Sequence, residues 1–183
     1  MKILALSGSL RGASVNSALL RAASRVAPPS YTIALFMRLG ALPLFNPDLE
    51  GAPPAPVLEL RAAVDRADAL MIASPEYAHG ISGTMKNALD WLVSHEGFVA
   101  KPVALINTSP RAHHAYQALV ETLTTMSANI IREACFVVPL LGSGLGEEGM
   151  ADDPAIAAAI RRALQDLERA VKQGTAPGPN FPV

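Results

Sequence analysis

Five short apolar runs alternate with longer segments of helical periodicity, and this alternation constrains the fold of the 183-residue chain more than any other feature. The apolar runs cover residues 3–6, 32–36, 69–73, 103–107 and 134–138. The helical segments cover residues 16–26, 56–67, 84–93, 113–127 and 153–172. Strands that alternate with helices are typical of an α/β fold with a parallel sheet, so we predict five strands and five helices in that arrangement.

The last predicted helix has clear signals at both ends. Asp152 or Asp153 can cap its first turn, Pro154 suits the first helical position, and Gly174 follows the last turn. One face of this helix is apolar and is expected to cover the sheet. The residues of that face are Ile156, Ala159, Ile160, Ala163, Leu164, Leu167 and Val171.

Two segments are irregular by composition. Residues 42–56 are rich in proline, so they cannot form a regular helix or a central strand and should wrap over the surface. Residues 174–183 are rich in proline and glycine. We therefore predict a single domain over residues 1–173, followed by a C-terminal tail over 174–183.

Composition limits the partners and the setting of the chain. Hydrophobic residues make up 50% and charged residues 17%, which argues against disorder. The net charge of −1 gives no electrostatic footprint for nucleic acid or for an anionic membrane, and no apolar run reaches the roughly eighteen residues of a membrane span. Cys135 is the only cysteine, so neither an internal disulfide nor a cysteine zinc cluster can form. We predict a cytoplasmic protein that binds neither nucleic acid nor membranes.

The first predicted strand ends at a loop rich in Ser and Gly, residues 7–16, with the sequence S-G-S-L-R-G-A-S-V-N. A strand that stops at such a loop and restarts as a helix presents free backbone N–H groups and a positive dipole end to an anion. Ser9, Ser14 and Asn16 add neutral donors, and the planar guanidinium of Arg11 suits phosphate oxygens. The loop matches neither G-x-G-x-x-G nor G-x-x-x-x-G-K-[ST]. It is a candidate phosphate site, and the alternative is a helix N-cap without a ligand.

A second loop follows the third predicted strand and leads into a helix, over residues 74–91. Tyr77 offers a flat face on which a planar ligand could stack, and the alternative is a half-buried aromatic at the sheet edge. The helical spacing of Trp91 favours a place in the core or at a subunit interface over a contact with a ligand. Lys86 and Asp90 lie four residues apart and are expected to form a surface ion pair.

Together the two loops resemble those of a known family. The first reads G-S-L-R-x-x-S-x-N from residue 8, and the second reads P-E-Y from residue 75, followed by G-x-x-K-N-A-L-D-W from residue 83. This combination closely resembles the NADPH-dependent FMN reductase family, a flavodoxin-like group that includes bacterial quinone and chromate reductases. The segment L-P-L-F-N-P-D at residues 42–48 extends the likeness, which reaches to about residue 127. It implies a flavodoxin-like three-layer α/β/α sandwich whose five-stranded parallel sheet has the order 2-1-3-4-5.

The resemblance also implies an FMN site. The residues implied to surround the FMN phosphate are Ser9, Arg11, Ser14, Val15 and Asn16. The residues implied to lie along the isoalloxazine ring are Pro75, Glu76, Tyr77 and Ala78. Ser109, after the fourth predicted strand, occupies the position of a third flavin-contacting loop. No catalytic side chain and no metal are expected, because the flavin carries the chemistry.

The chain departs from the family pattern in two places. Relatives usually carry Asn at the position of Ala78 and often Pro at that of Ser82, which implies that a side-chain contact near the ring or the ribityl chain is missing. Residues 111–114, R-A-H-H, replace the usual glycine pair. Both departures concern the affinity for FMN or the choice of hydride donor.

The segment 111–114 admits several interpretations. A metal site is disfavoured because His113 and His114 have no evident third ligand, and adjacent helical side chains point in different directions. Arg111 could contact a phosphate of a nicotinamide nucleotide or pair with Glu76. A solvated arginine is the simplest alternative.

The implied activity is that of an FMN-dependent NAD(P)H oxidoreductase. Hydride would pass from the C4 of NADPH or NADH to the flavin N5, and electrons would then reach a quinone or a similar small-molecule acceptor. Alternatives are a flavin reductase that supplies reduced FMN to a partner monooxygenase, a non-enzymatic FMN-binding electron carrier or redox sensor, and an assembly module that has lost FMN. The nearly neutral charge disfavours the carrier. The resemblance further implies a homodimer or homotetramer, with the helix at 84–93 near the contacts.

Overall fold

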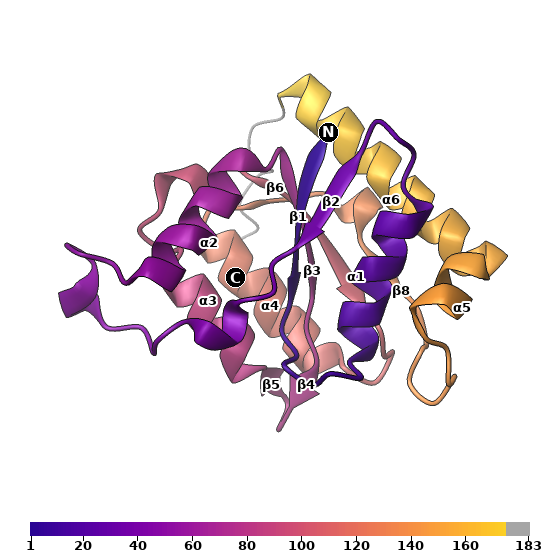
Figure 1. The fold of residues 1–183 in the computed structure, drawn as a ribbon, viewed down its shortest axis with the longest axis horizontal. Helices are drawn as coiled ribbons and strands as arrows, with labels where there is room; N and C mark the ends of the chain where they lie inside the picture. Colours follow the sequence, from indigo (N-terminus) through magenta and orange to yellow (C-terminus); the bar gives the residue numbers. More distant parts are fainter. Residues whose placement is uncertain (175–183) are drawn as a thin grey trace.

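A parallel sheet between two layers of helices forms the framework of the protein (Figure 1). The structure is a computed structural model that describes residues 1–174. Within these residues the main sheet has six strands: β1 (Lys2–Ser7), β2 (Thr32–Leu35), β3 (Ala69–Ala73), β6 (Pro102–Asn107), β7 (Asn129–Ile130) and β8 (Phe136–Val137). A separate antiparallel hairpin consists of β4 (Glu76–Tyr77) and β5 (Gly80–Ile81).

The order of the main sheet is β2-β1-β3-β6, with β7 and β8 both paired to β6, and every pair is parallel. The predicted order is confirmed for its first four strands. The fifth place is shared, because β7 pairs with the beginning of β6 and β8 with its end. The expectation of five strands, the last at residues 134–138, is therefore corrected to six.

A 3-10 turn, η4 (Arg132–Ala134), interrupts the edge of the sheet between β7 and β8. At this break the N–H of Leu105 donates to the Sγ of Cys135 at 3.2 Å, and the thiol donates to the carbonyl oxygen of Ile131 at 3.3 Å. Burial raises the pKa of the Cys135 thiol, which keeps it protonated and able to donate. The charged pair Arg132 and Glu133 lies in this break, between the two short strands.

The five predicted helices are all present, and a sixth, α5, follows a glycine-rich segment that carries no helical signal. The helices are α1 (Val15–Val26), α2 (Ala55–Arg66), α3 (Gly83–Asp90), α4 (His113–Thr125), α5 (Glu147–Asp152) and α6 (Pro154–Gln173). Helix α3 ends at Asp90 rather than at residue 93. The carboxylate of Glu147 fastens α5 to α1 through ion pairs with Arg21 and Arg25.

The end signals of α6 act as predicted. The Asp153 carboxylate accepts hydrogen bonds from the N–H groups of Ala155 and Ile156, both at 2.9 Å, and Gly174 ends the helix with a φ of 58°. The rest of the predicted tail lies outside the described residues. No helix within residues 1–174 is both long and apolar enough to cross a membrane.

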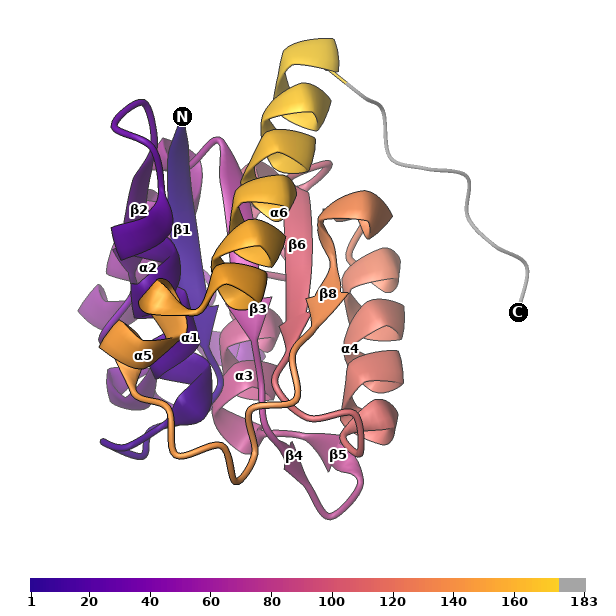
Figure 2. The ribbon, with the colours of Figure 1, turned by 90° about the vertical axis from the view of Figure 1, so that its right-hand side faces the viewer.

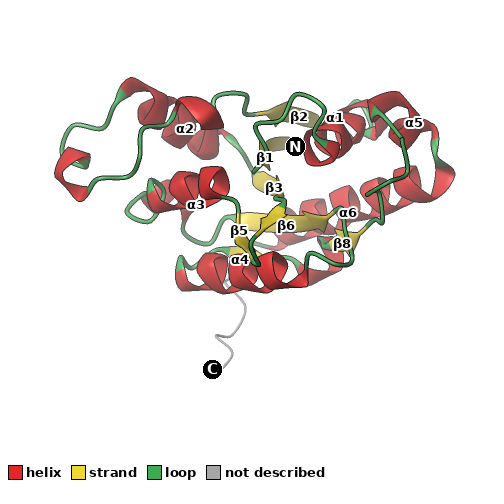
Figure 3. Ribbon diagram, turned by 90° about the horizontal axis from the view of Figure 1, so that it is seen from below, coloured by secondary structure: helices red, strands yellow, loops and turns green. Residues whose placement is uncertain are grey.

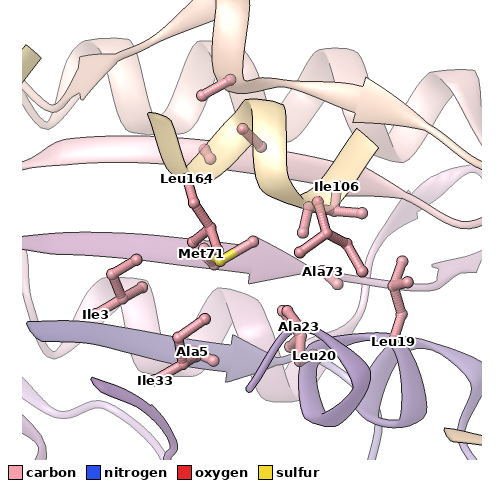
Figure 4. Close-up of a cluster of buried hydrophobic side chains, with 14 of the residues drawn as sticks. Ile3, Ala5, Leu19, Leu20, Ala23, Ile33, Met71, Ala73, Ile106 and Leu164 are labelled. Atoms are coloured by element: carbon pink, nitrogen blue, oxygen red, sulfur yellow. The ribbon is translucent and has the colours of Figure 1, made fainter. Parts of the chain in front are cut away.

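Two hydrophobic cores lie on the two faces of the sheet. Because successive strand residues point to opposite faces, Ile3 and Ala5 pack under α1 and α6, while Leu4 and Leu6 pack under α2 and α3. Figure 4 shows the first core, in which Leu164 of α6 lies over the strands. In the view from below, α2 and α3 lie on one side of the strands and α1, α5 and α6 on the other (Figure 3). The three-layer prediction is confirmed.

The proline-rich segment wraps over the surface as predicted until α2 begins at Ala55, and it contains one 3-10 turn, η2 (Pro47–Leu49). Another 3-10 turn, η1 (Leu39–Ala41), comes directly before it. Helix α3 holds the proline-rich segment in place. The carbonyl oxygen of Pro43 accepts hydrogen bonds from Asn87 Nδ2 at 2.9 Å and from Trp91 Nε1 at 2.8 Å. Trp91 is fully buried, which confirms its expected place in the core.

Candidate functional site

The loops that follow β1, β3 and β6 meet at the carboxyl edge of the sheet, at the bottom of Figure 2. The hydroxyl of Ser82 donates to the carbonyl oxygen of Gly8 at 2.6 Å, which joins the first loop to the second. The hydroxyl of Thr108 donates to Asn16 Oδ1 at 3.0 Å, which joins the first loop to the third. In an open α/β sheet this edge is where ligands bind.

The first loop ends in the N-terminus of α1. Ser14 is the N-cap, and its Oγ accepts the N–H of Ser17 at 3.2 Å. The helix therefore begins at Val15, one residue before the predicted start. The helix N-cap is therefore present. It does not exclude a ligand, because the cap satisfies only one of the several free N–H groups at this helix end.

Several donors of the first loop point to an anion. Within residues 1–174, the backbone N–H groups of Gly12, Ala13, Val15 and Asn16 have no hydrogen-bond partner. The exposed side chain of Arg11 has no ion pair within the same residues. Unpaired N–H groups at a helix N-terminus beside a guanidinium form a donor set suited to a phosphate monoester, so these residues fit the phosphate of FMN.

The second loop folds as a hairpin whose turn has two residues. Its turn residues, Ala78 and His79, have φ values of 48° and 60°, the left-handed conformation that two-residue hairpins require. Asn and Gly adopt this conformation more readily than Ala, so the sequence A-H gives no hairpin signal. The side chain of Tyr77 is 60% exposed, and the interpretation as a half-buried aromatic is wrong.

Glu76 faces α4 through its carboxylate, which accepts the N–H of Ala115 at 2.9 Å. The N-cap residue of α4, Ala112, has no capping side chain, so Glu76 caps this helix from another loop. The hydrogen bond from Ala115 holds the pKa of the Glu76 carboxyl below its ordinary value, and nearby histidines act in the same direction. The alternative pairing of Glu76 with Arg111 does not form.

Sequence reasoning did not identify the roles of Ser82 and Thr108 in joining the loops. The Oγ of Ser82 accepts the N–H of Met85 at 3.2 Å, so Ser82 is the N-cap of α3. A serine directly before a helical segment is a signal that could have identified this cap. The bond between Thr108 and Asn16 joins residues 92 positions apart and has no local signal.

The third loop follows Asn107, and its Ser109 is half-exposed at the same edge. Its backbone N–H donates to Asn107 Oδ1 at 2.9 Å, and the Nδ2 of Asn107 donates to the carbonyl oxygen of Ala112 at 3.3 Å. These bonds shape the turn into α4. The contact with the first loop comes from Thr108 rather than from Ser109.

A third imidazole lies beside the predicted histidine pair. The rings of His113 and His114 are centred 4.0 Å apart, and the ring of His79 stacks on that of His114 at 4.4 Å. Such stacked rings cannot aim their nitrogen lone pairs at one ion. Within residues 1–174 no group of three or more His, Cys, Asp or Glu residues is arranged to hold a metal.

A three-layer α/β/α fold whose parallel sheet begins with the order β2-β1-β3-β6 belongs to the flavodoxin-like class of proteins. A profile of the NADPH-dependent FMN reductase family matches residues 1–140, and the chain belongs to this family. The family likeness and the oxidoreductase class predicted from the sequence are therefore confirmed, as is FMN with NAD(P)H as the cofactor pair of this family.

Two relatives and one solved structure illustrate the similarity. An NAD(P)H-dependent FMN reductase of Pseudomonas aeruginosa is 32% identical over 180 residues, which are 94% of this chain and 96% of that protein. An NADPH:quinone oxidoreductase of Arabidopsis thaliana is 40% identical over 114 residues, 59% of this chain and 58% of that protein. The flavoenzyme NAD(P)H:(acceptor) oxidoreductase FerB of Paracoccus denitrificans superposes with a TM-score of 0.79 at 24% identity, over 92% of this chain and 97% of that one.

Proposed function

We propose that this chain is an FMN-dependent oxidoreductase in which bound FMN accepts hydride at N5 from the C4 of NAD(P)H and passes electrons to a quinone or a similar small acceptor. One observation carries the proposal. Among the described residues, the N-terminus of α1 offers unpaired backbone N–H groups next to the guanidinium of Arg11, which has no ion pair there. The family supports the same cofactor.

The residues of the first loop would hold the phosphate. The N–H groups of Val15 and Asn16 donate along the helix axis, where the dipole favours negative charge. Arg11 adds a charge-assisted bond, and the hydroxyls of Ser9 and Ser14 complete the set. The side chain of Asn16 is occupied by Thr108, so we assign it to positioning and its backbone to binding.

The hairpin would lie along the isoalloxazine ring through Pro75, Tyr77 and Ala78. The carboxylate of Glu76 is bonded to α4, so we assign that side chain to positioning and only its backbone to the ring. Because Ala78 lacks the Asn side chain that relatives usually carry, only backbone groups would contact this part of the ring. Ser109 would border the ring from the third loop.

The test is the visible spectrum of the purified protein during turnover. We expect a yellow protein whose absorbance near 450 nm bleaches with NADPH under anaerobic conditions and recovers when a quinone is added. Failure of the apoprotein to bind FMN at micromolar concentration would overturn the proposal. Rapid bleaching by NAD(P)H alone would exclude the electron-carrier alternative.

We also propose that residues 1–173 act as one FMN-binding unit that assembles as a homodimer or homotetramer in the cytoplasm. The assembly is supported by exposed apolar side chains near α3, since Leu44 is 85% and Val93 62% exposed. Light scattering coupled to gel filtration tests the assembly. A monomer at micromolar concentration would contradict it.

A further inference from the structure

The three neighbouring imidazoles have no part in the proposed chemistry. We call His79, His113 and His114 the histidine cluster. His79 comes from the hairpin turn, and the other two begin α4. All three side chains are exposed. The cluster therefore presents imidazole nitrogens to solvent where the second and third loops meet.

One carboxylate and one guanidinium lie beside the cluster. On the hairpin, Glu76 lies close to all three rings, but its carboxylate already accepts the N–H at the start of α4. On the adjoining loop, Arg111 is exposed and has no ion pair within residues 1–174. The Nδ1 of His113 lies 3.2 Å from the carbonyl oxygen of Arg111. The ring nitrogens of His79 and His114 have no hydrogen-bond partner among the described residues.

The cluster offers hydrogen-bond donors on one exposed surface. Every imidazole carries at least one N–H group, and a guanidinium carries five. An anion that lies across the rings could accept the ring N–H groups together with those of Arg111.

We propose that the histidine cluster and Arg111 form a subsite for a phosphate group of the nicotinamide dinucleotide. The inference rests on the proposed function, because His79 directly follows Tyr77 and Ala78, which we place along the ring. A donor whose nicotinamide reaches the ring must lay its phosphates across a neighbouring surface. That phosphate is either the 2′-phosphate, which distinguishes NADPH from NADH, or the pyrophosphate that both contain.

The binding test needs neither FMN nor turnover. The imidazole Cε1–H resonances are followed by NMR at about pH 6, where imidazole is largely protonated, during titration with 2′-AMP, ADP-ribose or adenosine. Tighter binding of 2′-AMP with movement of the cluster resonances supports the 2′-phosphate, and tighter binding of ADP-ribose supports the pyrophosphate. The proposal is overturned if 2′-AMP and ADP-ribose bind no better than adenosine and leave these resonances unmoved.

The kinetic test uses the FMN-loaded enzyme with His113→Gln/His114→Gln and, separately, Arg111→Gln. We expect KM for NADPH to rise about tenfold, the size of one lost charge-assisted hydrogen bond, with kcat within about twofold. An equal rise in KM for NADH assigns the pyrophosphate. Arg66→Gln, an exposed arginine at the end of α2, is the matched control and should leave KM unchanged.

Two results separate a subsite from a structural role. If the Kd for FMN rises by the same factor as KM, the cluster acts by holding the hairpin in place, and the subsite proposal is wrong. Unchanged KM for both donors also overturns it. Failure of the proposed function is read separately, from the absence of a flavin spectrum in the parent protein, while the nucleotide titration still decides the subsite.

Discussion

The carboxylate of Glu76 and the backbone N–H of Ala115 are joined by a hydrogen bond of 2.9 Å that connects the β4–β5 hairpin to the first turn of α4. The bond satisfies one of the free donors at the N-terminus of a helix whose own N-cap is an alanine. It also sets the position of the segment that we place along the flavin ring. The same side chain thus serves the stability of α4 and the geometry of the site.

Replacing Glu76 tests this capping role through its pH dependence. The lowered pKa of Glu76 means that its contribution is fully present above the unfolded-state pKa of ~4.3 and is lost as the pH falls through the lower folded-state value. We expect Glu76→Ala to lower the Tm by about 3 °C at neutral pH, and the gap to the parent to close in acid. Differential scanning calorimetry between about pH 7 and pH 3 measures this gap. The Tm of Glu76→Gln should lie between those of the parent and Glu76→Ala. A Tm difference between parent and Glu76→Ala that stays constant across this pH range contradicts the capping role.

Ala78 occupies a backbone conformation that favours glycine, with a φ of 48°. Glycine has no Cβ penalty there, so we expect Ala78→Gly to raise the free energy of unfolding by about 0.5–1 kcal/mol. The matched control is Ala62→Gly inside α2, where the same exchange should cost about 1 kcal/mol. Urea denaturation measures both. The interpretation fails if the two variants change stability in the same direction.

Gly8 has no room for a side chain. A Cβ at this position would lie 2.5 Å from Ser74 Oγ and 2.7 Å from Ser82 Oγ. We expect Gly8→Ala to destabilise the protein by about 1–3 kcal/mol and to weaken FMN binding, because the first two loops must move apart. Gly12→Ala is the control, since a Cβ there meets nothing within 4 Å. Thermal unfolding and fluorescence titration with FMN should separate the two variants.

Arg11 supplies the one formal charge of the phosphate loop. Loss of a charge-assisted hydrogen bond should weaken FMN binding by about tenfold to a hundredfold in Arg11→Ala, with little change in Tm. Arg66→Ala removes a comparable exposed charge outside the site. Quenching of flavin fluorescence measures both affinities. A variant that binds FMN as tightly as the parent would remove Arg11 from the site.

Features that depend on local sequence were predictable. The alternation of apolar runs and helical segments identified every central strand, since β1, β3 and β6 are buried on both faces. The cap residues of α6 were predictable because Asp153 and Gly174 cap the helix through residues close to them in the sequence. Because these strands are parallel, the loops that follow them lie at one edge of the sheet.

Features that depend on contacts between distant segments were not predictable. The split at η4 is stabilised by Cys135, which is bonded to Leu105 of the neighbouring strand and to Ile131, and β7 has only two residues, too few for a recognisable strand pattern. The hairpin lacks the usual turn residues, so Ala78 and His79 concealed it. The histidine cluster exists only because that hairpin folds against α4, which brings His79 to His114.

The three loops of the site form a closed ring of contacts. Ser82 joins the second loop to the first, Thr108 joins the third to the first, and Glu76 joins the second to the start of α4. No loop can open without breaking bonds to the other two, so their amide protons should exchange with solvent as one cooperative unit. Because the loops are already ordered, they lose little conformational entropy when a ligand binds. More of the interaction energy is then available for affinity.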